Sequence, residues 1–167
     1  MSDLDTLLLA NREAVDELVL AAERCESAWT VPRAAGKWSP AQIVEHVARS
    51  LEEGGNVVQE RPSKLPSLPF FVRPLAGMMF HRILKRGAFF KAKTNKAMNP
   101  IEGPATVDAA RVRLVAALGE FERDCRARKS AGGVLKSPAF GTVSVEEYAR
   151  FVELHTRHHT KQMPVIL

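Results

Sequence analysis

The last part of the chain contains a segment that predicts one long helix with a histidine-rich face. Ser144 and Glu147 have the spacing of a capping box at its start, and Pro164 marks its far end. Within this segment His155 and His159 lie four residues apart, so their imidazoles project from one face of the helix. Such a pair can bind a single metal ion, but a metal site needs at least a third protein ligand. The segment therefore predicts half of a metal site.

A second segment supplies a candidate for the missing ligand. Ser39 is a strong N-cap residue, and Gln42 completes a capping box three residues later. In the helix that follows, His46 falls on the same side as Ile43 and Val47. This places His46 on the apolar, inward face of the helix. On its own, an inward histidine is more commonly a hydrogen-bonded core residue than a metal ligand.

His158 competes with His159 as the partner of His155, because a spacing of three residues also places two side chains together. Histidines near a helix C-terminus also occur as surface residues, where the helix dipole favours a cation. The predicted inward face comprises Tyr148, Phe151, Val152, His155 and His159. We therefore predict a site made of His46, His155 and His159, with His158 on its rim. Three neutral imidazoles leave a fourth position open, which is typical of catalytic sites.

The hydrophobic periodicity of the whole chain predicts an all-α protein. Apolar residues recur at spacings of three and four in four long segments, and no strand pattern exceeds a few residues. The segment 129–142, which is rich in Gly and Pro, is predicted to be a loop. We expect a single domain over residues 1–167, a four-helix bundle without a sheet. The four predicted helices span residues 3–26, 39–56, 106–128 and 144–162.

A long basic insertion, residues 61–105, separates the second and third helices. It contains nine Lys and Arg residues and a single acidic residue, Glu102, whereas the rest of the chain has 15 basic and 18 acidic residues. The net charge of +5 is therefore local and does not by itself indicate nucleic-acid binding. We expect a short helix over 75–86, stopped by Gly87, that covers one end of the bundle as a lid or forms a homodimer face, with Met79 and Phe80 mostly buried.

Nothing in the sequence indicates a membrane span or a secretory signal. No apolar run approaches the ~20 residues that a span requires, and the N-terminus is polar and acidic. Cys25 and Cys125 are too few for a disulfide framework, so we interpret them as reduced and half-buried. These features favour a cytoplasmic protein.

Two segments resemble the signatures of the DinB-like (damage-inducible B) metalloprotein superfamily. They are Trp38-Ser-Pro-x-x-Ile-x-Glu-His46 and Pro138-x-Phe-Gly-x-x-Ser144 followed by His155-Thr-Arg-His-His159-x-x-Gln162. The resemblance implies an up-down four-helix bundle with an unusual connection between helices two and three. It also implies a divalent metal, often nickel or zinc, bound by His46, His155 and His159. Some members of this group are thiol-dependent transferases or isomerases.

These observations lead to a functional hypothesis and its alternatives. We expect a metal-dependent enzyme that transfers a low-molecular-weight thiol to a small electrophilic substrate, with basic residues of 82–96 receiving the carboxylates of the thiol. The alternatives are a metal-dependent hydrolase and a non-catalytic, metal-stabilised bundle. Such a bundle would serve as an interaction or stress-response protein whose segment 70–96 meets an anionic membrane or another chain. Glu45 and Glu153 are candidates to hold the imidazole N–H groups, although solvated surface charges are the favoured interpretation.

Overall fold

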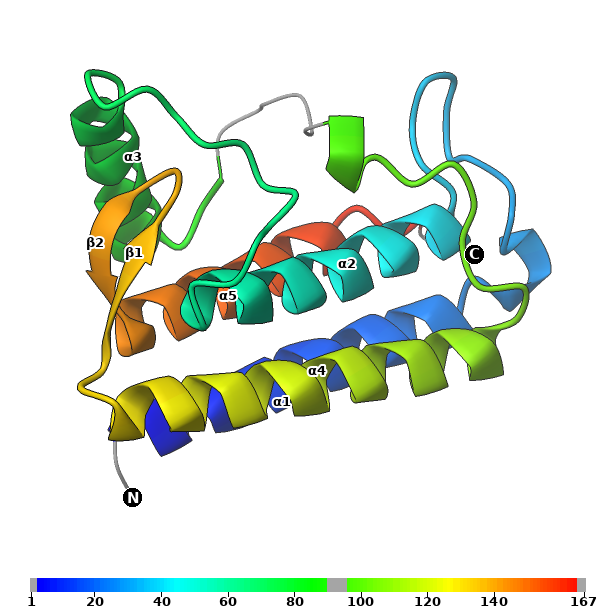
Figure 1. Ribbon diagram of the computed structural model, residues 1–167. Helices are drawn as coiled ribbons and strands as arrows, with labels where there is room; N and C mark the ends of the chain where they lie inside the picture. Colours follow the sequence, from blue (N-terminus) through cyan, green and yellow to red (C-terminus); the bar gives the residue numbers. More distant parts are fainter. Residues whose placement is uncertain (1–2, 90–95, 165–167) are drawn as a thin grey trace.

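Four long helices form the body of the protein (Figure 1). The computed structural model describes residues 3–89 and 96–164. All four helices predicted from the sequence are present, with ends that differ from the prediction by no more than three residues. They are α1 (Asp3–Glu23), α2 (Pro40–Val58), α4 (Val107–Ser130) and α5 (Val145–Thr160).

The apolar faces of these helices meet in one core. The apolar residues of α4 that recur at spacings of three and four are buried in this core, and Phe121 among them has no exposed surface. Burial of these faces supplies the main favourable free energy for a fold of this kind. Large side chains that are almost completely buried include Leu8, Val15, Leu18, Ile43, Val47, Leu51, Leu114 and Phe121.

The side-chain contacts define the directions of the helices. Arg113 at the start of α4 pairs with Glu52 of α2, and Gln59 just after α2 donates to the Asp124 carbonyl further along α4 at 2.6 Å. These two helices therefore run parallel. Helix α4 runs antiparallel to α1, because Arg126 near the end of α4 pairs with Asp5 at the start of α1. The up-down order thus holds from α1 to α2 and from α4 to α5, and a long connection crosses back between α2 and α4 (Figure 1).

The prediction of a loop over residues 129–142, and of a fold without a sheet, was wrong. Strands β1 (Val134–Ser137) and β2 (Gly141–Ser144) form an antiparallel hairpin between α4 and α5. Leu135 lies opposite Val143, and both are buried against the bundle. Gly141 has a φ of 78°, which the sharp reversal at the start of β2 requires and glycine adopts without strain. The four residues of each strand do not alternate between apolar and polar in the sequence, although alternate residues of β1 are buried.

The connection between α2 and α4 contains the short helix predicted from the sequence. Helix α3 (Arg73–Arg86) packs against α5 and β2, and it ends at Gly87 with a φ of 64°. Phe80 is fully buried, as predicted, where its ring stacks on Phe140 at a centroid distance of 4.7 Å. Met79 was also expected to be buried, but 40% of it is exposed. One residue turns a helix by about 100°, so Met79 lies to one side of the face that Phe80 and Ile83 bury against the protein.

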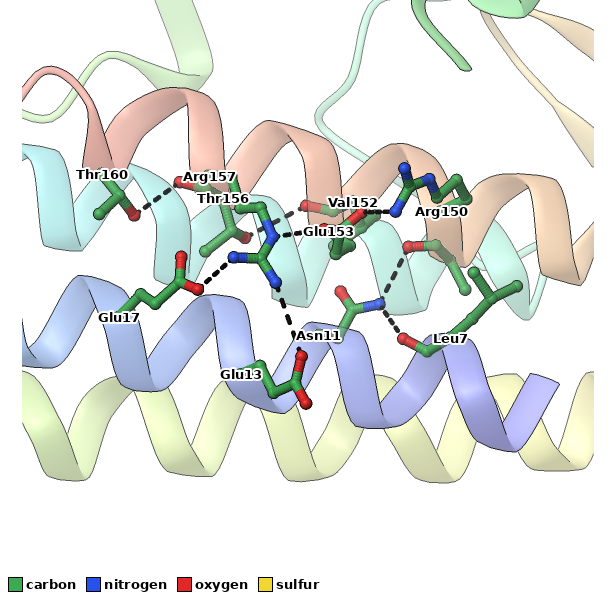
Figure 2. A network of polar contacts seen from close by, with 11 residues as sticks. Leu7, Asn11, Glu13, Glu17, Arg150, Val152, Glu153, Thr156, Arg157 and Thr160 are labelled. Atoms are coloured by element: carbon green, nitrogen blue, oxygen red, sulfur yellow. Dashed lines mark hydrogen bonds and ion pairs between the residues drawn. The ribbon is translucent and has the colours of Figure 1, made fainter. Parts of the chain in front are cut away.

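A polar network fixes α5 against α1 (Figure 2). The guanidinium of Arg157 contacts Glu153 on its own helix and reaches Glu17 and Glu13 on α1. Glu153 is 98% buried and also accepts from Arg150 at 2.5 Å, so its carboxylate is paired on both sides. A buried carboxylate without such partners would be strongly destabilising. The network therefore favours a single rotation of α5 about its axis.

The end of the long connection is attached to the start of α2. Short helices η1 (Glu26–Ala28) and η2 (Lys96–Met98) flank this region. The predicted capping box is present, with Ser39 and Gln42 bonded reciprocally, and the Gln42 amide also donates to the Ile101 carbonyl at 2.9 Å. Gly103 lies against the carbonyl of Ala41, where a Cβ has no room. Residues 98–103 are therefore held close to the helix that carries His46.

Both cysteines of the chain, Cys25 and Cys125, are free and buried, more deeply than predicted. Within residues 3–89 and 96–164, none of the helices is long and apolar enough to cross a membrane.

The Gly103→Ala substitution should destabilise the protein. Its Cβ would overlap backbone atoms of Ala41, so the connection would have to move away from α2. Overpacking of this kind costs about 1–3 kcal/mol, which chemical denaturation can measure as a lower free energy of unfolding. Gly119→Ala is the matched control, because the nearest atom to its Cβ is 3.8 Å away and alanine favours a helix interior by roughly 0.5–1 kcal/mol. Equal stability of the two variants would contradict the role assigned to Gly103.

Candidate metal centre

Three histidines predicted from the sequence converge between α2 and α5. The Nε2 atom of His155 lies 3.4 Å from Nε2 of His46 and 3.1 Å from Nε2 of His159. One potential ligand atom from each residue lies within 4.8 Å of the other two, and these three residues form a group that could hold a metal ion. His46 and His159 are buried, whereas His155 retains some accessible surface.

The spacing of these nitrogens fits a tetrahedral ion. Two nitrogens bound at 2.0–2.1 Å to a tetrahedral centre lie roughly 3.3–3.4 Å apart. The two observed distances from Nε2 of His155, 3.1 and 3.4 Å, are close to that value. The residues present therefore fit a divalent ion with three nitrogen ligands.

The other ring nitrogens define which tautomers are present. Nδ1 of His46 lies 2.9 Å from the Met98 carbonyl, which can only accept, so Nδ1 carries the proton. Nδ1 of His159 lies 3.2 Å from Oε1 of Gln162, whose amide nitrogen contacts Nε2 of His158 at 2.9 Å. In both neutral rings the proton is on Nδ1, and Nε2 presents a lone pair to the centre. Partners of this kind orient the histidines of metal sites.

The positions of Met98 and Gln162 were not predicted as part of the site. Gln162 was within the quoted signature, and its spacing of three residues from His159 is a signal that could have identified it. Met98 contributes a backbone carbonyl from a distant part of the chain, so no side-chain pattern marks it. His158 lies outside the group of three nitrogens, in agreement with its predicted place on the rim.

The two carboxylates considered as imidazole partners do not have that role. Glu45 pairs with Arg49 at 2.7 Å and with Arg113 at 3.4 Å. Glu153 is held by arginines on the α1 side of α5, as described above. Glu153 is also buried, so the interpretation of it as a solvated surface charge was wrong as well.

Burial and mutual proximity keep the three histidines neutral. Burial lowers the pKa of His46 and lowers the pKa of His159 to about 3. The pKa of His155 lies well below its ordinary value because of burial and because His159 and His46 are adjacent. Metal ions bind neutral imidazole, so these shifts favour coordination at physiological pH.

The three histidines line a pocket of about 1240 Å³. Trp38 covers His46 with a ring centroid distance of 4.7 Å, and Phe89 contacts His155 at 5.5 Å. Phe140 and Phe151 contribute further aromatic surface. A pocket with apolar walls and a few polar groups that point inward is the usual form of a small-molecule site.

The charged residues at this pocket differ from those predicted. Of the basic residues of 82–96 that the structure describes, Lys96 lines the pocket and the others do not, while Lys91 and Lys93 lie outside the described residues. Arg33 and Lys37, from the loop before α2, line it instead. No acidic residue is among the described residues of the lining, so the pocket favours an anionic ligand.

Comparison with known protein families matches residues 7–163 to the DinB superfamily. The match covers nearly the whole chain, and the protein belongs to this superfamily. No curated protein and no solved structure gives a significant match to the chain.

The metal-free protein should lose stability as the pH falls below about 6.5. In the unfolded chain His159 takes up a proton near that pH, whereas in the folded protein burial lowers its pKa to about 3. The unfolded state therefore binds the extra proton first, and the free energy of unfolding falls by about 1.4 kcal/mol per pH unit for such a group. Urea unfolding in a chelator at several pH values measures this slope.

The His159→Gln variant should show a shallower slope between about pH 4 and 6, because it lacks one of the groups that titrate only on unfolding. The matched control is His81→Gln, which replaces an exposed histidine away from the site. If both variants retain the slope of the unmodified protein, His159 is not held neutral by the fold.

Proposed function

We propose that this protein is a metal-dependent enzyme, in which His46, His155 and His159 hold one divalent ion, zinc or nickel. The observation that supports this most is the convergence of three Nε2 atoms at the wall of a large pocket. Three protein ligands leave at least one coordination position for a substrate. We also propose that the four helices form the metal-binding bundle typical of the superfamily.

A bound divalent ion would lower the pKa of a thiol or a water molecule and so supply a nucleophile at neutral pH. The residues of the chain hold and orient the site. The Met98 carbonyl and the Gln162 amide fix two of the imidazole rings. Trp38 and Phe89 cover the imidazoles on their outer sides and reduce access of bulk water.

We propose a low-molecular-weight thiol as the cosubstrate, transferred through sulfur to a small electrophile. Small cellular thiols commonly carry carboxylates, and the basic residues Arg33, Lys37 and Lys96 line the same pocket as the histidines. The aromatic walls suit an apolar electrophile beside the thiol. We place this reaction in the cytoplasm, where such thiols are kept reduced.

The other two functions make different predictions. A metal-dependent hydrolase would turn over its substrate without any thiol. A non-catalytic bundle would bind the ion tightly but show no turnover with or without thiols. A screen of electrophilic substrates and esters against common thiols, with the metal content of untagged protein measured in parallel, distinguishes the three.

Replacement of His155 by Ala should remove the metal and the activity together. The Nε2 atom of His155 lies within hydrogen-bonding distance of the Nε2 atoms of both His46 and His159. Elemental analysis should fall from a single ion per chain to less than about a tenth of one. The melting temperature of protein isolated with metal should also fall, because the binding free energy stabilises the folded state.

His158→Ala is the matched control, since His158 is the next histidine on the same helix but lies outside the group of three. It should retain both metal and activity. The proposed ligand set is wrong if His158→Ala loses the ion while His159→Ala keeps it.

Gln162→Ala should weaken metal binding without abolishing it. The substitution removes the acceptor for Nδ1–H of His159 and the donor to His158. Loss of such a partner typically costs about 10–100-fold in metal affinity, which competition with a chromogenic chelator can measure. Lys161→Ala changes the adjacent exposed residue and should leave the dissociation constant unchanged. An affinity of Gln162→Ala equal to that of the control would contradict the positioning role.

A further inference from the structure

The start of α3 exposes a cluster of large apolar side chains, which we call the apolar tip. Phe70 and Phe71, just before the helix, are 81% and 71% exposed, and Leu75 and Met78 of the first turns are each more than half exposed. Met79 completes the cluster. Isolated exposed apolar residues are common, but here five lie within ten residues of the chain, and the rings of Phe70 and Phe71 are in contact. Exposed apolar surface concentrated in this way is typical of an interaction site.

The same outward face of α3 becomes cationic toward its end. Arg82, Lys85 and Arg86 are exposed, and each follows residues of the tip at spacings of three, four or seven, which places them on one side of the helix. The connection that contains α3 has no acidic residue of its own between Glu60 and Glu102. The outward face of α3 is thus apolar in its first half and positively charged in its second.

The opposite face of α3 is anchored to the body of the protein. Phe80 and Ile83 are buried, and Phe80 packs on Phe140 and Phe151. In Figure 1 α3 stands with the hairpin on the side of α2 and α5 that is away from α1 and α4. At this corner of the protein the apolar tip is outermost, and the three cations lie nearer the end of α3, where Gly87 faces Leu154 of α5 (Figure 1).

We propose that this corner docks the protein on an anionic membrane surface. Phe, Leu and Met side chains enter the boundary between headgroups and acyl chains, and Lys and Arg beside them meet the anionic headgroups. A second copy of the chain fits less well, because a parallel two-fold contact through α3 would bring the same three cations against each other, and an antiparallel one would place them on the apolar tip of the other copy. A nucleic acid offers phosphates to the cations but no apolar region for Leu75 and Met78.

The proposal is tested by sedimentation of the full chain with vesicles. The protein should bind vesicles made of equal parts phosphatidylglycerol and phosphatidylcholine, and bind pure phosphatidylcholine vesicles at least about tenfold more weakly. Added salt should weaken the binding, since the headgroup attraction is screened.

Two double variants separate the contributions of the apolar tip and the cations. Phe70→Ser with Phe71→Ser should lower the partition coefficient by about tenfold or more, because two exposed aromatic rings no longer enter the lipid. Lys85→Gln with Arg86→Gln should lower it by a similar factor on the anionic vesicles only. Neither pair is buried, and retained helical circular dichroism checks that both variants fold.

The matched control is Val112→Ser with Val115→Ser, which removes two exposed apolar side chains of α4 far from this corner (Figure 1) and should leave binding unchanged. Three outcomes would overturn the proposal. They are no binding to anionic vesicles, a dimer in sedimentation equilibrium that the Phe70 and Phe71 variant abolishes, and tighter binding to an oligonucleotide than to the vesicles.

Discussion

The rotation of α5 about its own axis is the constraint on which the site depends. Arg157 lies two residues from both His155 and His159, which places it about 200° away on the helix. When the guanidinium of Arg157 is paired with Glu153 and Glu17 on the α1 side, the two histidines must face α2. The polar contacts on one side of α5 thus select the direction of the metal-binding face on the other.

Helix packing alone does not complete the site, because buried imidazoles need partners for both ring nitrogens. The Nδ1–H of buried His46 needs an acceptor, because a buried N–H group without one is costly. The long connection supplies one by placing the Met98 carbonyl 2.9 Å away. The docking of residues 98–103 on the start of α2 is therefore part of the centre and not only a link between helices.

The features that could be predicted from the sequence are those set by local spacing. Both capping boxes, the apolar stripes and the shared face of His155 and His159 follow from intervals of three and four residues, and the structure has all of them. The hairpin, the Met98 carbonyl and the place of Arg33 at the pocket depend on how distant segments meet. No interval in the sequence encodes them. The exposure of Met79 beside buried Phe80 shows the same limit within one helix, since the periodicity of a short helix did not fix which side faces inward.

The two faces of α3 connect the surface of the protein to the candidate centre through aromatic rings. Phe80 on the inner face lies 4.7 Å from Phe140 and 5.2 Å from Phe151, and the Phe151 ring lies 6.5 Å from that of His155. Contact of this kind does not by itself establish energetic coupling. It does show that Phe80 packs directly on two phenylalanines, Phe140 and Phe151, that line the pocket. The segment between α2 and α4 thus shapes the site from both ends, through a backbone carbonyl at one and an aromatic wall at the other.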